Sequence, residues 1–469
     1  MKKKIAVLLA FLCLFCSPAF VFSACSQQPA ESAGIRLEDF ESKEYPQDKQ
    51  FVFFADYPPT SDKNLLQTYK GAGFNAFNLI PWPDAAYNNG FDPESPENCG
   101  LTSTLNLLEE LEMDAYIWGC GTTVVQAPDI GLNDPNKPGL YYPGLDLTEY
   151  PAFSGFYVKD EPSSADFGHL GGEVAAFWNE TYADSGAYWH VNLFPSYASG
   201  EQLGTTAGGG KTAYQNYVDK YVAEVLNHVE GSKGIGMDHY AFKTGGINDM
   251  YLYDLMVVAQ AAKQTGATLH NCIQAVSGTG WREMQSAAEV RWNYYTSLAF
   301  GTKVFEVFAY LDDLNQGFHC MVGTEKNDMY YYQQEVIAEL KKFAHVYLSF
   351  DWEGVKTFIG TENEQQANGS FELLEADGRM LQELKGISSV TATQDTLIGQ
   401  FSDGEDSGFI VVNVTDPVQT KFDVVTLKFE DCSRVIVYQG GEEVKYAISG
   451  NTLELPLVAG EGMFVIPQY

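Results

Sequence analysis

The chain has 469 residues, of which 45% are hydrophobic, 14% are aromatic and only 19% are charged. Lys and Arg total 28 against 62 Asp and Glu, so the formal net charge at pH 7 is −34. The aromatic content argues against disorder, and the negative charge argues against nucleic-acid binding and against adsorption to anionic lipid headgroups. The composition therefore predicts a globular protein of two or three domains whose partners are neutral or cationic.

The first 48 residues are predicted to export and tether the chain. Residues 1–24 begin with three lysines, continue with an apolar run and end in small residues, as a signal peptide does. Cys25 directly after them resembles the lipobox of bacterial lipoproteins, in which the Cys thiol carries the lipid anchor. Phe22 stands where Leu is usual, which leaves secretion without an anchor as the alternative. Residues 25–48 are expected as the anchor Cys and a flexible tether, and the protein as an extracytoplasmic lipoprotein of the bacterial cell membrane.

Cysteine and histidine usage predicts neither a disulfide framework nor a metal site. The seven His residues do not cluster at ligand spacing, and no Gly-rich phosphate fingerprint follows the first predicted strand. We therefore expect no metal ion and no cofactor. The cysteines after Cys25 are too sparse for a framework and form no CxxC pair; they are Cys99, Cys120, Cys272, Cys320 and Cys432.

Residues 49–350 are predicted to form a (β/α)8 barrel, the TIM-barrel architecture. Short, nearly continuous apolar segments alternate there with amphipathic helical ones, which indicates parallel strands covered on their outer face. Eight such units fit a closed barrel better than an open doubly wound sheet. The expected strands are 51–58, 73–82, 115–118, 155–161, 188–195, 235–240, 268–276 and 303–310.

Residues 351–469 are predicted to form an antiparallel β-sandwich domain. Short segments of alternating polarity are separated there by Gly, Asp and Asn turns. Such a domain is more often a structural support than a binding site. The expected strands are 396–401, 408–414, 424–429, 434–438, 452–457 and 462–466.

The carboxyl ends of the predicted barrel strands carry the candidate site, because the loops after these strands meet at one end of a barrel. Acids lie at these ends beside aromatic side chains, without a metal or phosphate motif. Glycosidic hydrolysis needs this combination: one carboxyl protonates the leaving oxygen, and a second attacks the anomeric carbon or activates water. Like charges held close, together with partial burial, push the two pKa values apart.

Glu161 is the candidate general acid and base. Pro162 disfavours helical backbone at the residue before it, so the fourth strand is expected to stop at Glu161 with the carboxylate at the rim. The alternative is a charge at a helix N-terminus, because Pro162 and Ser163 also open a helix well. In a regular strand, Asp160 points to the opposite side, where it would pair with Lys159 or a neighbouring strand.

Asp238 and Glu306 are the candidates for the second catalytic carboxylate. Each lies in an apolar strand, where an acid is costly unless it is paired or used. The alternatives are an Asp238 bonded to backbone or to His239, and a Glu306 paired with a basic residue of the core. The amides of Asn192 and Gln274 would bind hydroxyls or satisfy barrel backbone. The residues expected to bind substrate are Asp56, Tyr57, Trp82, Trp118, Asp160, Asn192, His239, Tyr240, Gln274 and Tyr310.

At these strand ends the chain resembles the TIM-barrel glycoside hydrolases related to family 42 β-galactosidases and the wider clan A. It is similar in particular to bacterial lipoproteins that share a Lys-Asp-Glu-Pro strand end. With the C-terminal sandwich, the likeness covers most of residues 50–469. The stretches that carry it are 159–162, 192–197, 238–240, 297–301 and 308–310.

The resemblance implies catalytic positions that this sequence fills only in part. In clan A, the acid/base Glu of the fourth strand follows Asn, and the nucleophile Glu ends the seventh strand. Here Glu161 takes the acid/base position but follows Asp160, and the seventh strand ends near Gln274 without a carboxylate. Either Asp238 or Glu306 then supplies the second carboxylate, or the substrate supplies its own nucleophile.

The leading hypothesis from the sequence is an exported, cell-surface glycoside hydrolase that acts on an oligosaccharide or glycan. It would bind a carbohydrate substrate and no nucleic acid, and it would contact the membrane only through the lipid at Cys25. The missing carboxylate on the seventh strand favours a second hypothesis, a catalytically inert glycan-binding lipoprotein. A third is a structural surface protein with a vestigial pocket.

Overall fold

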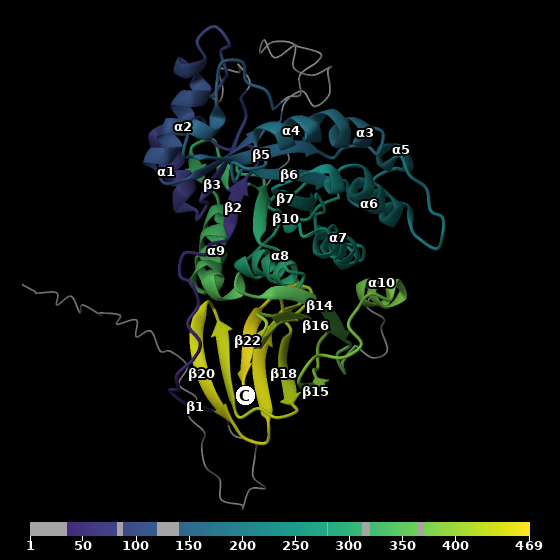
Figure 1. Cartoon of the computed structure of the whole chain (residues 1–469). Coiled ribbons are helices and arrows are strands. Elements are labelled where there is room, and N and C mark those ends of the chain that lie inside the picture. The colour runs from purple at the N-terminus through teal and green to yellow at the C-terminus, as the bar shows by residue number, and fades with distance from the viewer. Residues whose placement is uncertain (1–34, 82–87, 120–139, 279, 312–318, 364–368) are drawn as a thin grey trace, which may run out of the picture.

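A computed structural model describes residues 35–81, 88–119, 140–278, 280–311, 319–363 and 369–469. In Figure 1, the purple-to-green part of the chain forms an upper body of helices and strands, and the yellow C-terminal strands form a lower one. No helix of the described residues has the length and apolar character that crossing a bilayer requires.

Eight parallel strands form a nearly closed barrel, which confirms the predicted fold. The first and second strands meet through Asn75, which donates its backbone N–H to the Phe53 carbonyl (3.1 Å). The Asn75 side-chain oxygen accepts the Phe53 N–H in return (2.8 Å). The barrel strands are β2 (Val52–Ala55), β3 (Ala76–Leu79), β4 (Asp114–Trp118), β5 (Phe153–Asp160), β6 (Tyr188–Leu193), β7 (Ser232–Met237), β10 (Thr268–Gln274) and β11 (Val304–Phe308).

Helices with recognisable end signals cover the outside of the barrel. α6 (Ala213–Glu224) begins after Thr212, whose hydroxyl accepts the Gln215 N–H (3.1 Å) while the Gln215 side chain accepts the Thr212 N–H (2.8 Å). α7 (Tyr251–Thr265) ends at Gly266, whose left-handed backbone (φ 68°) suits glycine. The other barrel helices are α1 (Lys63–Gly71), α2 (Gly100–Glu110), α3 (Phe167–His169), α4 (Ala175–Thr181), α5 (Gly200–Leu203), α8 (Ala287–Ala299) and α9 (Asp328–Tyr347).

Two glycines of β7 make room for large side chains inside the barrel. A Cβ at Gly234 would lie 1.7 Å from the Tyr188 hydroxyl. A Cβ at Gly236 would lie 3.0 Å from His190 Cε1 and 3.1 Å from His270 Cδ2. The amino-terminal half of the interior is mainly aromatic, and polar residues follow toward the carboxyl ends of the strands. The aromatic cluster comprises Phe54, Ala76, Tyr116, Tyr157, Tyr188 and Val304.

The C-terminal strands form two antiparallel sheets around a second hydrophobic core, as predicted. Five elements were not predicted: α10 (Gly369–Asp377), β1 (Ile35–Leu37), which pairs with β20, and the strands β14, β15 and β20 themselves. One sheet has the order β1-β20-β19-β22-β17-β16-β14, and the other β15-β18-β21. The bounds are β14 (Asp351–Phe358), β15 (Ile387–Thr391), β16 (Thr396–Ser402), β17 (Ser407–Asn413), β18 (Phe422–Phe429), β19 (Arg434–Gln439), β20 (Glu442–Ile448), β21 (Thr452–Val458) and β22 (Gly462–Gln468).

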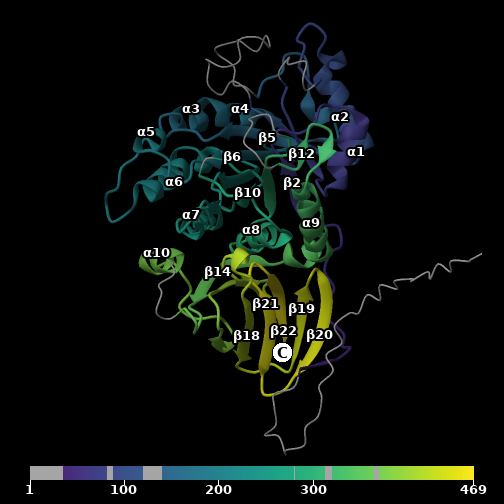
Figure 2. The same ribbon diagram turned by 180° about the vertical axis from the view of Figure 1, so that it is seen from behind.

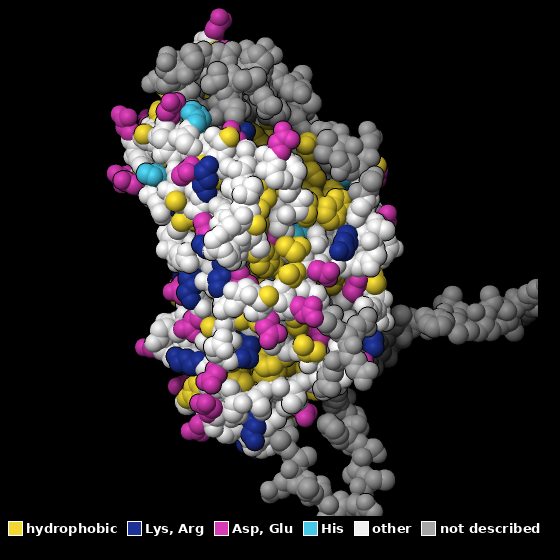
Figure 3. Space-filling view, turned by 90° about the vertical axis from the view of Figure 1, so that its right-hand side faces the viewer, with side chains coloured by type: hydrophobic (Ala, Val, Ile, Leu, Met, Phe, Trp, Pro, Cys, Tyr) yellow, Lys and Arg dark blue, Asp and Glu magenta, His cyan; other side chains and the backbone are white. Residues whose placement is uncertain are grey.

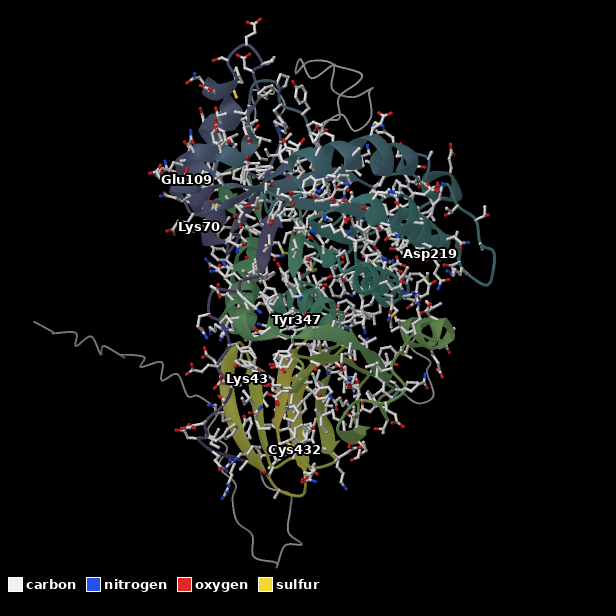
Figure 4. The ribbon with its side chains drawn as sticks, in the orientation of Figure 1. Lys43, Lys70, Glu109, Asp219, Tyr347 and Cys432 are labelled. Atoms are coloured by element: carbon white, nitrogen blue, oxygen red, sulfur yellow. The ribbon has the colours of Figure 1, made fainter. Side chains whose placement is uncertain are left out.

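The sandwich packs directly on two barrel helices. Figures 1 and 2 both show α8 and α9 between the barrel strands and the sandwich, and Figure 4 labels Tyr347 of α9 at this junction. On α8, the Trp292 indole donates to the Val414 carbonyl (3.1 Å). Arg282 holds Asp416 through two hydrogen bonds of 2.7 Å each. α8 is buried over most of its surface, and its polar side chains Asn293, Thr296 and Ser297 donate hydrogen bonds to backbone carbonyls of the same helix.

We expect Gly399→Ala to destabilise the protein, because this junction leaves no room for a Cβ. An added Cβ would lie 2.1 Å from the Ala299 carbonyl oxygen at the end of α8. Overpacking of this kind costs about 1 to 3 kcal/mol. Chemical denaturation measures the loss against Gly172→Ala, where an added Cβ meets nothing within 4 Å. Equal stability of the two variants would contradict the described packing.

Candidate active site

The carboxyl ends of the barrel strands bring five acids together, which we name the carboxylate cluster. The pKa of each member is raised by the charge of at least one other member. The helices α3 and α5, which follow the ends of β5 and β6, lie at the right of Figure 1. Figure 3 shows the molecule from this side, with hydrophobic side chains gathered below the grey atoms. The members of the cluster are Asp56, Asp160, Glu161, Asp238 and Glu306.

An irregularity in β5 turns Asp160 toward the cluster. The register with β6 shifts after Tyr157, so that Tyr157 is opposite His190 while Asp160 is opposite Asn192. The extra residue reverses the alternation of side chains beyond it. Asp160 accepts a hydrogen bond from the Tyr157 hydroxyl (2.8 Å). The regular strand assumed from the sequence would have pointed Asp160 away from the site.

Glu161 is held at the rim by a strained backbone. Its φ is 42°, in the left-handed region that non-glycine residues seldom adopt, and its N–H donates to the Asn192 carbonyl (2.8 Å). The side chain is half-buried. Burial, and then the charges of Asp238 and Asp160, raise the pKa of Glu161 to about 9. Glu161 therefore carries a proton at neutral pH.

Asp160 and Asp238 are two half-buried carboxyls that oppose each other's ionisation. Burial is the largest cause of the raised pKa of each, followed by the charge of Asp56 on Asp160 and the charge of Asp160 on Asp238. Asp238 follows the last residue of β7 and is not bonded to His239, the alternative considered from the sequence, because His239 pairs elsewhere. Because the pKa of Glu161 is raised further than those of Asp160 and Asp238, these two acids lose their protons before Glu161 does.

Beneath the rim, Asp56 and Glu306 form a fully buried pair. The Asn78 amide donates to Asp56 (2.6 Å), and Glu306 Oε2 lies 2.9 Å from His270 Nε2. Burial raises the pKa of Glu306 to about 8, and burial and then the charge of Glu306 raise that of Asp56. Glu306 is 0% exposed, so a substrate cannot touch it directly. Its partner is a histidine, not the Lys or Arg considered from the sequence.

His190, His270 and Glu306 have the composition of a metal site but not its geometry. Their candidate ligand atoms all lie within 4.8 Å of one another. However, the two imidazole rings are stacked, with centroids 3.7 Å apart and planes inclined by 5°. Ring-nitrogen lone pairs lie in the ring planes, so parallel rings do not aim them at one ion. Burial lowers the pKa of His270 to about 3, which keeps that ring neutral.

His239 and Gln274 support the loop after β7. Asn248 accepts the Met250 N–H with its side-chain oxygen, so its amide nitrogen faces His239 Nε2 (2.7 Å). His239 Nδ1 then carries the proton and donates to Asp254 (2.6 Å). Gln274 accepts the Phe242 N–H (2.8 Å) and donates to the Phe242 carbonyl (3.0 Å). Both side chains are therefore engaged in holding the polypeptide around Asp238.

Aromatic rings surround the cluster on two sides. Trp118 stacks on Tyr157 at 4.4 Å, and Tyr240 stacks on Phe308 at 5.6 Å. Tyr57 packs edge-on against Phe308 (5.7 Å). Flat apolar faces of this kind suit contact with sugar rings.

One predicted residue lies elsewhere, two fall outside the described residues, and several were missed. Tyr310 is 1% exposed and packs on Tyr69 in the outer core, while Trp82 and Cys25 lie outside the described residues. Strand parity could have identified His190 and Cys272, because they precede the predicted positions Asn192 and Gln274 by two residues. The same spacing on β10 adds His270. Also missed were Asn78 and two residues outside the barrel strands, Tyr197 and Trp281, whose rings pack on His239 and Tyr240.

A cavity of 440 Å³ lies at the other, amino-terminal end of the barrel. Residues at the starts of the strands line it, among them Asp114, Tyr116 and Lys303. None of the carboxylate cluster borders it. The candidate catalytic residues therefore lie at the opposite end of the barrel from this cavity.

The sequence matches no family model and no curated protein. Among solved structures, the fold is similar to a GH27 β-L-arabinopyranosidase from Geobacillus stearothermophilus (10% identity, TM-score 0.41, covering 90% of this chain and 97% of that one). It is also similar to Gan42B, a GH42 β-galactosidase from G. stearothermophilus (9%, TM-score 0.47, 90% and 100%). A third is α-galactosidase I from Mortierella vinacea (10%, TM-score 0.40, 90% and 97%). We draw no functional conclusion from likenesses this distant.

We expect the stability of the protein to fall between about pH 5 and pH 9. The folded-state pKa values of Glu161 and Glu306, about 9 and 8, lie above their ordinary value of 4.5. The folded state therefore binds more protons than the unfolded state in this window, and unfolding becomes easier as pH rises. Differential scanning fluorimetry across this range gives the slope of Tm against pH.

Glu306→Gln should make that slope shallower, because it removes one buried carboxyl while preserving its shape. The control is Glu201→Gln, which makes the same change in charge at an exposed position of α5. Parallel curves for the wild type and Glu306→Gln would contradict the described environment of Glu306.

Proposed function

We propose that the protein is a glycoside hydrolase in which Glu161 is the general acid and Asp238 the second carboxylate. The observation that carries this proposal is a half-buried rim carboxyl, Glu161, beside two partly exposed acids, where burial and the charges of Asp238 and Asp160 raise its pKa to about 9. A proton donor next to an ionisable carboxylate is the pairing that glycosidic hydrolysis needs. The relation to family 42 and clan A, which rests on short strand-end motifs, is part of this proposal.

In the proposed reaction, Glu161 gives its proton to the leaving glycosidic oxygen as the bond to the anomeric carbon breaks. In an inverting reaction, Asp238 takes a proton from the water that attacks the anomeric carbon, and both carboxyls then return to their starting states by proton exchange with solvent. In a retaining reaction, Asp238 attacks that carbon itself, and water, which gives a proton to Glu161, then displaces Asp238 and releases the sugar. Asp238 is favoured over Glu306 because Glu306 is fully buried. Asp160, Asn192 and the rings of Trp118 and Tyr240 would contact the sugar.

A second candidate function is glycan binding without cleavage. The observation that favours it is β10, whose inward positions carry Cys272 and Gln274 instead of a carboxylate. Binding without turnover on every glycoside tested would support this candidate and exclude the first.

We also propose that the protein works outside the cell, attached by a lipid at Cys25. The support comes from the sequence, in which basic residues, an apolar run and small residues precede this cysteine. An acidic protein that does not bind anionic headgroups would be held at the membrane by the lipid alone.

Glu161→Gln is expected to lower kcat by about 100- to 10,000-fold on glycosides with poor leaving groups, while binding is retained, because the variant cannot donate a proton. The loss should be smaller with a 2,4-dinitrophenyl leaving group, which departs without protonation. Wild-type kcat/KM should fall as pH rises past the pKa of Glu161, about 9.

The matched control is Glu180→Gln, an exposed residue of α4. Turnover by Glu161→Gln at the wild-type rate on every leaving group would remove Glu161 from the proposed mechanism.

Cys25→Ala should abolish incorporation of labelled palmitate and release the protein from the membrane fraction of the expressing bacterium. Cys99→Ala, which removes a buried thiol of the barrel domain, is the control and should leave both properties unchanged. Labelling that persists in Cys25→Ala would place the lipid elsewhere, and an unlabelled wild type outside the membrane fraction would show secretion without an anchor.

A further inference from the structure

The carboxylate cluster has almost no positive charge to balance it. Among the described residues, no Lys or Arg forms a salt bridge with any of its five members; the histidines beside Glu306 are the basic groups in contact. The charge of Lys159 lowers the pKa of Asp160, although the two side chains form no salt bridge. Because these acids are buried without a Lys or Arg bound to them in the described structure, a cationic ligand would stabilise their ionised form.

Two buried acceptor atoms of this site lack a hydrogen-bond donor in the described structure. Asp238 Oδ1 and Asn192 Oδ1 are buried and accept no hydrogen bond within the described structure, and Asn192 is 2% exposed. Buried acceptors without a donor are costly, and a ligand that brings N–H groups would satisfy them. An acidic ligand would instead add acceptors and like charge.

We propose that the sugar bound beside Asp160 and Asp238 carries a protonated amino group, and that uronic acids are rejected. An ammonium group supplies three N–H donors for these unpaired acceptors, and a positive charge to acids that no Lys or Arg of the described residues pairs with. The substrate class is then a glycan containing a free, non-acetylated amino sugar. This inference deepens the proposed function and rests on it for the position of the sugar.

The test compares 4-nitrophenyl glycosides of gluco and galacto configuration at about pH 6, where a sugar amine is protonated. The set contains the neutral hexosides, the 2-amino-2-deoxy sugars, their N-acetyl forms and the uronides. We expect kcat/KM to be highest for the amino sugars, and roughly tenfold or more lower for the uronides than for the neutral sugars. The N-acetyl form controls for the bulk of the substituent without its charge.

Asp160→Asn should reduce the preference for the amino sugar over the neutral sugar. Asp219→Asn is its matched control, because Asp219 lies on the outer side of α6 and its loss changes the net charge equally (Figure 4). An effect of the same size in both variants would assign the preference to the overall charge of the protein and overturn the proposal. Uronides that react as well as neutral sugars would also overturn it.

Binding of the methyl glycosides to the full chain, measured by calorimetry, separates this inference from the proposed function. Preferential binding of the amino sugar without turnover of any aryl glycoside would support the inference and reject the hydrolase. Turnover of neutral sugars without a preference for the amino sugar would support the hydrolase and reject the inference. Failure of every sugar to bind or react would overturn both.

Discussion

The burial of several acids in one barrel interior, with no Lys or Arg bound to them in the part of the chain that the structure describes, is the constraint on which the rest of the site depends. An ionised carboxylate taken out of water costs several kcal/mol unless it is paired, so such groups retain protons instead. In this chain, Glu306 and Asp56 lie hydrogen-bonded below the rim, and Asp160 and Asp238 crowd Glu161 above them. The raised pKa of Glu161 follows first from its burial and then from that crowding.

Maintaining this arrangement requires rigid surroundings, which the fold supplies in layers. The His239–Asp254 pair and the Gln274 amide fix the loop after β7, and the Asn192 carbonyl fixes the backbone of Glu161. Outside them, α8 is fully covered because the sandwich packs on it. The second domain thus stabilises the barrel wall that carries β10 and β11, which is consistent with the structural role usual for such a domain.

The barrel could be predicted from the sequence because its strands are nearly continuous apolar runs, a pattern that parallel burial alone produces. The location of Glu161 at a strand end also followed from local chemistry, since Pro162 stops the strand. The orientation of Asp160 could not be predicted, because a single extra residue in β5 reverses it and leaves no compositional trace. The burial of Glu306 and the stacking of His190 on His270 depend on which strands become neighbours, which is a tertiary property.

The short strand β1 has a consequence for the solubility of the sandwich. By pairing with β20, it occupies an edge of the seven-stranded sheet that would otherwise present unpaired backbone groups to solvent. Lys43, bound to Asp403 and Glu405, fastens the following segment to the same domain. The segment that contains β1 therefore covers an edge of the sheet, and it hinders pairing of that edge with a sheet of another copy of the protein.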